Sequence, residues 1–181
     1  KKLNKTIIFV SHDLDEALKI GTKIAIMESA EIIQQDTPEQ IVLNPATEYV
    51  ERFVAHTNPL NVLRGDSLMT PLDQLIQVED RYQVEDTLVS VSDQQQVLTV
   101  EQAGTNCELV NWQIGMPIDK LQQGTIVRVP LDISMRDAVE IRYHTKQYLL
   151  LEKEQKLVGV LGDHNFYHAL LGKHFNRNEV A

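Results

Sequence analysis

The sequence has few of the features that define several large classes of protein. Cys107 is the only cysteine in 181 residues, so no disulfide can form within the chain, and this usage is typical of a reducing, cytosolic compartment. Basic residues are also scarce, with 17 Lys and Arg against 26 Asp and Glu and a net charge of −9. Binding to a nucleic-acid backbone needs a basic excess, so we expect no nucleic-acid partner.

Long apolar runs are absent as well. The longest, such as residues 7–10 and 148–151, are far shorter than the roughly 20 residues that a membrane-spanning helix requires, so we expect no direct insertion into a membrane. The first run is also shorter than the apolar core of a secretory signal, about 7–15 residues, and acidic residues follow it directly. Because the chain begins with Lys1 and not with methionine, we expect it to be a fragment of a longer protein.

Glycine-rich phosphate-binding loops are missing too. Neither the pattern GxxxxGK[ST] nor GxGxxG occurs anywhere in the 181 residues. Such loops hold the phosphates of a nucleotide through backbone N–H groups. The chain by itself is therefore not expected to bind and hydrolyse a nucleotide.

The first residues predict a strand followed by a helix. The run TIIFV at residues 6–10 is rich in β-branched and aromatic residues, which is typical of a strand buried on both faces. Asp13 and Glu16 have capping-box spacing, and Gly21 can end the helix that they start. Without neighbouring strands we expect residues 1–58 to pack poorly and to be disordered, swapped or cleaved, because an unpaired apolar strand exposes its hydrogen-bonding edge.

Two strands and two helices are predicted next. Residues 23–35 indicate two strands around a turn at 28–30. Thr37, followed by Pro38 and Gln40, predicts one helix start, and Asn44 with Pro45 predicts another. We expect the second helix to bury Val50, Phe53 and Val54 and to end near a domain boundary at Asn58 and Pro59.

The remaining residues predict mainly strands, then a regular alternation. Residues 87–91 and 96–100 alternate in polarity as strands do. From residue 124 the order strand, helix, strand, strand, helix is predicted, with Ser134 and Asp137 in the first turn of one helix and Gly172 after the other. The chain is therefore expected to have a mixed α/β (α+β) fold.

Few residues suggest chemistry of their own. Ser11, His12 and Asp13 have the types of a catalytic triad, but triad members meet in space and not as sequence neighbours. His164 and His168 are four apart on a predicted helix and could bind a metal together with Asp163 or His174. An exposed polar helix face explains these histidines more simply, and Trp112 is expected to anchor the core.

Four segments of residues 1–58 occur in a fixed order: SHDLDEAL, KIAIM, EIIQQDTPEQI and NPATEYV. In this order they resemble the C-terminal end of the ATP-binding subunit of an ABC transporter. The resemblance implies that His12 is the switch histidine, which contacts the γ-phosphate of Mg-bound ATP between two subunits of the intact parent. It also implies that the other ATP-binding motifs lie upstream. Ala30 stands where the family usually has a glycine.

The segment VAHTNPLNVLRGDSLM resembles the linker of transporters for glycine betaine, choline and related quaternary amines. In that family a tandem cystathionine-β-synthase-type (CBS) module follows the ATPase domain, which implies such a module at 59–181. Repeat one, about 59–121, is irregular, and repeat two, about 122–172, matches well. The resemblance implies a homodimer through the module, a membrane permease subunit as partner, and a cytoplasmic location at the inner face of the cell membrane.

CBS modules often bind adenine nucleotides, and the family pattern is Gly, two apolar residues, Thr or Ser, two further residues, then Asp. In this chain Gly159 opens the pattern, Gly162 stands in the Thr place and Asn165 in the Asp place. By this resemblance Gly159, Gly162, Asp163 and Asn165 are possible nucleotide contacts. Asn165 could still bond a ribose hydroxyl, but it brings no charge.

Three roles are therefore open for residues 59–181. The module could regulate transport by sensing a nucleotide or ionic strength. Residues 59–181 contain 11 basic and 17 acidic residues, so the two subunits of a dimer would repel each other, and salt would relieve that repulsion. It could instead be a ligand-free dimerisation scaffold, or it could bind a metal. The sequence alone does not say which amine the parent carries.

Overall fold

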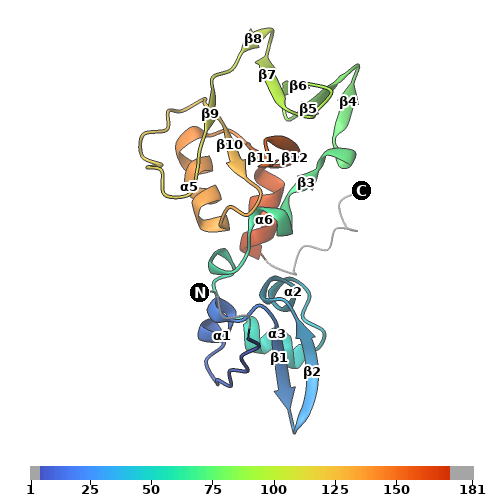
Figure 1. Cartoon of the computed structure of the whole chain (residues 1–181), viewed down its shortest axis with the longest axis vertical. Helices are drawn as coiled ribbons and strands as arrows, with labels where there is room; N and C mark the ends of the chain where they lie inside the picture. Colours follow the sequence, from blue (N-terminus) through green and yellow to red (C-terminus); the bar gives the residue numbers. More distant parts are fainter. Residues whose placement is uncertain (1–4, 172–181) are drawn as a thin grey trace. The chain divides into compact units, whose positions relative to one another are not determined.

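The computed structural model describes residues 5–171 of the chain (Figure 1). They divide into two compact units between Val62 and Leu63, and each unit is described by itself. A short 3-10 turn, η1 (Pro59–Asn61), belongs to the first unit, so the division comes just after the boundary that the sequence placed at Asn58 and Pro59. No helix among the described residues is long and apolar enough to cross a membrane.

The first helix, α1 (Leu14–Ile20), forms as its capping residues predict. The side chain of Asp13 accepts a hydrogen bond from the backbone N–H of Glu16, at 3.1 Å between Oδ1 and N. At the other end the N–H of Gly21 donates to the carbonyl oxygen of Ala17, at 2.8 Å. Both ends of the helix therefore have partners for backbone groups that would otherwise be unsatisfied.

The predicted strand pair is an antiparallel hairpin of β1 (Ile24–Glu28) and β2 (Glu31–Asp36). Ser29 and Ala30 form its two-residue turn with φ of 51° and 67°. A two-residue hairpin loop favours this left-handed geometry because its twist matches that of the strands. Ala30 therefore adopts a conformation that glycine would adopt at lower cost.

The two following helices agree with the sequence only in part. α2 (Pro38–Leu43) begins as predicted, with the Thr37 hydroxyl accepting from the N–H of Gln40. α3 (Glu48–Val54) begins later than predicted, because Thr47 and not Asn44 caps it. Phe53, expected in the buried stripe, is 39% exposed.

The prediction of a buried strand at residues 6–10 is wrong. No described strand pairs with this segment, and the side chains of Ile7, Ile8 and Val10 are 85–89% exposed. A strand needs neighbours for its backbone groups, and the described residues supply none. The expectation of poor packing holds only for this segment, since the rest of the unit encloses a small core of Leu18, Ile24, Ile26, Ile41, Val50, Val54 and Val62.

The second unit contains a meander of five antiparallel strands in sequence order. The two strands that the sequence predicted are its third and fourth members, and no helix lies between any of the five. This all-β meander occupies residues 76–106, within the segment of about 59–121 where the sequence predicted an irregular first repeat. Its strands are β4 (Ile76–Val78), β5 (Arg81–Val84), β6 (Thr87–Val91), β7 (Val97–Gln102) and β8 (Thr105–Asn106).

A second, mixed sheet of five strands has the order β3-β12-β11-β10-β9. Strand β10 is parallel to both β9 and β11, and β11 is antiparallel to β12. From residue 126 on, the predicted order strand, helix, strand, strand, helix is confirmed by the five elements β10 (Ile126–Pro130), α5 (Met135–Thr145), β11 (Leu149–Lys153), β12 (Lys156–Leu161) and α6 (Asp163–Leu171). The two edge strands are β3 (Thr70–Pro71) and β9 (Leu109–Asn111).

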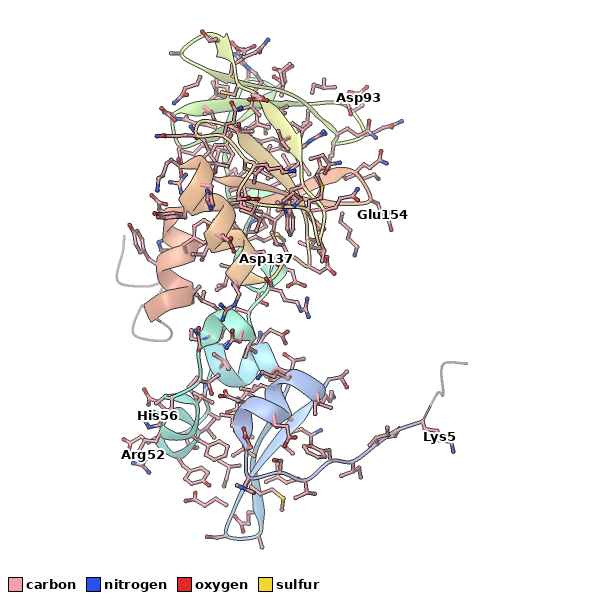
Figure 2. All side chains as sticks on the ribbon, turned by 90° about the vertical axis from the view of Figure 1, so that its left-hand side faces the viewer. Lys5, Arg52, His56, Asp93, Asp137 and Glu154 are labelled. Carbon is pink, nitrogen blue, oxygen red and sulfur yellow. The ribbon has the colours of Figure 1, made fainter. Side chains whose placement is uncertain are left out.

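The mixed sheet is buried on both faces. One face packs on the meander in a shared core that includes Val89 and Val100 from the meander and Ile126 and Leu150 from the mixed sheet. Strand side chains alternate between faces, so Leu149 and Leu151 point to the opposite side. The helices α5 and α6 contact one another and lie side by side in Figure 2.

The connection into the second unit is held by a close backbone contact. In α4 (Gly65–Leu68), the N–H of Gly65 donates to the carbonyl oxygen of Ile133, at 2.8 Å. A Cβ at Gly65 would lie 2.8 Å from Cδ2 of Leu151 and 2.9 Å from Cγ2 of Ile133. These distances are too short for carbon atoms, so glycine is required here by packing.

We therefore predict that Gly65→Ala lowers the free energy of unfolding by about 1–3 kcal/mol, because the added methyl group overpacks this contact. Chemical denaturation with urea measures the change. Gly162→Ala is the control, since its Cβ would come no closer than 3.3 Å to Oε1 of Glu85 and 3.9 Å to Oδ1 of Asn165. Equal stability of the two variants would contradict the prediction.

Candidate functional site

His12 lies in the first unit, directly before the residue that caps α1. Its side chain is exposed and, with Phe53 and His56, lines an open hollow of about 360 Å³; Figure 2 marks His56. The Ser11 hydroxyl accepts from the N–H of Asp13 at 3.0 Å and donates to Oε2 of Glu16 at 3.1 Å. Ser11 and Asp13 are therefore used to cap the helix and do not form a catalytic triad with His12.

The predicted nucleotide contacts lie in the second unit, at one end of the mixed sheet. Strands β10 and β11 begin at this end and β12 finishes there, because β12 runs antiparallel to β11. Helix α6 starts directly beyond β12. Gly162, Asp163 and Asn165 are brought to this end, whereas Gly159 lies within β12 itself.

Both glycines of the pattern have a structural role. A Cβ at Gly159 would lie 2.7 Å from Sδ of Met69 and 2.7 Å from the carbonyl oxygen of Thr70, so glycine allows β3 to approach β12. The N–H of Gly162 donates to Oδ1 of Asn165, at 2.8 Å. Since this N–H precedes the first turn of α6, the bond helps to cap that helix.

Asn165 is 5% exposed, and its amide is fully engaged within the protein. Its Nδ2 donates to the carbonyl oxygen of Leu68 at 2.6 Å and to Oγ1 of Thr70 at 3.1 Å. Its Oδ1 accepts from Gly162, as described. Asn165 thus ties the start of α6 to the end of α4 and to β3, and both donors of its amide are in use.

Asp163 belongs to an ion-pair cluster that the sequence did not reveal. Its Oδ1 accepts from Nε of Arg142 at 2.9 Å and forms an ion pair with Nη2 of Arg142 at 2.8 Å. The same Nη2 also lies 3.8 Å from Oε1 of Glu85. One guanidinium thereby joins α5, α6 and the turn between β5 and β6. The helical spacing of the sequence could have indicated this cluster. Arg142 shares a face of α5 with the buried residues Met135 and Ala138, so its charge needs a partner there.

A second polar contact at this end is buried. The hydroxyl groups of Tyr148 and Thr87 lie 2.6 Å apart, and Thr87 also donates to the carbonyl oxygen of Val84, at 2.8 Å. Burial raises the pKa of Tyr148 well above its usual value, so the phenol stays neutral and donates to Thr87. This contact links the mixed sheet to the meander.

The charges at this end are mainly acidic. Burial raises the pKa of Glu85, and Arg142 opposes that rise while Asp163 and Asp86 add to it. A nucleotide phosphate needs positive charge or donors that are not already engaged. Arg142 is paired with carboxylates through Nε and Nη2, and the amide of Asn165 is bonded internally. The buried Nη1 of Arg142 has no hydrogen-bond partner among the described residues, and the nucleotide contacts stay a prediction.

The histidines considered as metal ligands lie on α6. Within residues 5–171 no group of three or more His, Cys, Asp or Glu side chains is placed to hold a metal ion. His174, the further candidate ligand, lies outside the described residues, as does Gly172. The structure therefore offers no support for a metal site on His164 and His168.

Trp112 is buried as expected, with 2% of its surface exposed. It also lines a hollow beneath the connection from β9 to β10, together with Glu108 and Lys120. Figure 1 shows this connection as a long loop between the two strands. All the residues that line this hollow lie between 108 and 125, in a segment whose sequence shows no binding motif.

Comparison with known proteins shows relatives along most of the chain. The carnitine transport ATP-binding protein OpuCA of Listeria monocytogenes is 31% identical over 185 aligned residues, which cover 89% of this chain and 44% of the relative. The choline transport ATP-binding protein OpuBA of Bacillus subtilis is 29% identical over 182 residues, or 89% of this chain and 46% of the relative. The chain thus spans less than half the length of these two relatives.

Identity is higher over a shorter part of the chain. The glycine betaine transport ATP-binding protein OpuAA of Bacillus subtilis is 49% identical over 67 residues, which are 37% of this chain and 16% of the relative. No protein-family model matches the chain. No solved structure matches it either.

The internal role of Asn165 gives a prediction. We expect Asn165→Asp to lower the free energy of unfolding at pH 7 by about 1–3 kcal/mol, because a buried carboxylate cannot donate to the carbonyl oxygen of Leu68. Burial would hold the folded-state pKa of the new carboxyl above its unfolded value of about 3.9. The loss of stability is therefore complete above the folded-state pKa, where the carboxyl is charged, and it fades below pH 4, where the carboxyl is protonated. Urea titrations at pH 7 and pH 3.5 measure both effects.

Asn106→Asp is the matched control, since Asn106 is exposed in β8. It should leave the stability nearly unchanged at both pH values. An Asn165→Asp variant as stable as the control at pH 7 would show that the amide is not required.

Proposed function

Because homologues of this chain are the ATP-binding subunits of ABC transporters for glycine betaine, carnitine and choline, we propose that the chain is part of such a subunit. The observation that carries the proposal is the 31% identity to OpuCA over 89% of the chain. A match of that extent is longer than either unit, so it includes parts of both.

In the intact subunit the first unit completes an ATP site. His12 is exposed at the start of α1, where its imidazole can donate to a terminal phosphate. ATP and Mg would be held by motifs that this sequence does not contain, and ATP hydrolysis would power the import of a quaternary-amine osmoprotectant. The subunit would act with a membrane permease at the cytoplasmic face of the cell membrane.

The second unit, in this proposal, regulates transport as a CBS-type module and forms a homodimer. The order β10, α5, β11, β12, α6 supports a CBS-like second repeat. The meander at residues 76–106 stands in the place of the first repeat and has no helix of its own. Regulation would then depend on the second repeat and on its contacts with the meander.

The role of His12 can be tested in the full-length subunit assembled with its permease. We predict that His12→Ala lowers the rate of ATP hydrolysis by about 10²-fold or more, as loss of a proton-transferring or phosphate-contacting group does. His56→Ala is the control, because His56 lines the same hollow but carries no proposed role. Similar hydrolysis rates in the two variants would refute the assignment of His12.

A second candidate, a dimerisation scaffold without a nucleotide, is favoured by the internal bonding of Asn165 and Asp163. It predicts no heat in calorimetric titrations of this chain with AMP or ATP. It also predicts a dimer whose association does not change over a salt series in sedimentation equilibrium. Saturable heat with either nucleotide, or salt-dependent association, would instead favour the sensor.

A further inference from the structure

A hollow of about 240 Å³ lies beneath the loop that joins β9 to β10, and we call it the Trp112 hollow. Its wall combines the apolar side chains of Val110, Trp112 and Met116 with Glu108, Lys120 and Thr125. Pockets for drug-sized ligands measure about 300–1,000 Å³. The Trp112 hollow therefore suits only a small molecule.

Local hydrogen bonds fix the apolar part of the hollow. The indole Nε1 of Trp112 donates to the carbonyl oxygen of Met116 at 3.1 Å, and the N–H of Gln113 donates to Sδ of Met116 at 3.3 Å. The N–H of Trp112 donates to the carbonyl oxygen of Arg128, at 2.9 Å, which anchors the loop to β10. The indole is thus held in place before any ligand arrives.

The two charged groups of the hollow have opposite sign. The hydroxyl of Thr125, which is 2% exposed, donates to Oε2 of Glu108 at 3.3 Å and so positions that carboxylate. Lys120 is exposed, and within residues 5–171 no ion pair joins it to Glu108. Both charges can therefore act on a ligand, and a ligand carrying both signs would satisfy them together.

We propose that the Trp112 hollow binds a small zwitterion with a quaternary ammonium and a carboxylate group. The methylated ammonium lies over the apolar wall beside Glu108, and the carboxylate faces Lys120. A quaternary ammonium group binds well against an aromatic ring because the negative face of the ring attracts the cation. The balanced charge of the hollow disfavours a polyanion such as ATP.

This inference rests on the proposed function, because it names as ligand the class of solute that the transporter would import. Relatives are described as transporters of glycine betaine and of carnitine, both zwitterions of this kind. Bound at the second unit, the solute would report its own concentration inside the cell. The second unit would then regulate import according to the amount already accumulated.

Trp112 is the only tryptophan of the chain, so its fluorescence reports on the hollow directly. We expect glycine betaine to cause a saturable change in the fluorescence of the 181-residue chain, and carnitine to do the same. Choline lacks the carboxylate and acetate lacks the ammonium, so each should bind at least tenfold more weakly. Sucrose at equal osmolality controls for solvent effects, and calorimetry repeats the titrations in case the fluorescence change is small.

Two substitutions separate the charged groups. Glu108→Gln should weaken glycine betaine binding at least tenfold, and Lys120→Gln should remove the preference for glycine betaine over choline. Glu140→Gln and Lys153→Gln are the controls, because both residues are exposed on other elements of the same unit. They should bind as the unchanged chain does.

Absence of saturable binding in both measurements overturns the inference, as does equal binding by the Glu108→Gln variant or equal binding of acetate. Failure here leaves the proposed function intact if the full-length subunit still hydrolyses ATP in a His12-dependent way. If this chain binds glycine betaine but the full-length subunit shows no His12-dependent ATP hydrolysis, the ligand site is supported and the proposed function is wrong.

Discussion

The second unit depends on burying both faces of strand β11. Its residues Leu149, Leu150 and Leu151 are each fully buried, although successive strand side chains point to opposite faces. A strand of this kind needs a layer on each side. The meander covers one face through the core that contains Leu150, and the contact of Leu151 with Gly65 and Ile133 lies on the other.

Because of this double burial, several polar groups near the strand are bonded to partners from other elements. Tyr148 directly precedes β11, and its hydroxyl can avoid an unsatisfied burial only by pairing with Thr87 of the meander. Arg142 and Asn165, on the two helices, are likewise tied to partners from other elements. The family pattern places a nucleotide at this end of the mixed sheet. In this chain the polar groups at that end instead join the meander, the mixed sheet and the two helices.

The sequence correctly predicted the features that depend on residues close together in the chain, such as helix starts. Capping residues located α1, α2 and α5, because a side chain three residues away satisfies the N–H groups of a helix start. The prediction of a strand at residues 6–10 was wrong because strand pairing depends on neighbours that are distant in the chain, and local composition gives no information about them. The Glu85–Arg142–Asp163 cluster was missed for the same reason, since its contacts join segments far apart in the chain.

The candidate sites differ in the same way. The sequence pattern located Asn165 and Asp163 correctly at the start of α6 but could not show that their polar atoms are engaged internally. The Trp112 hollow had no sequence pattern, because its charges come from Glu108 before β9 and Lys120 in the loop after it. A ligand needs groups that the fold leaves available. Among the described residues no ion pair involves Glu108 or Lys120, so by that measure they are better suited than Asp163, which is ion-paired to Arg142. If the second unit responds to a small molecule, the loop between β9 and β10 is where the structure leaves both charge and volume for it.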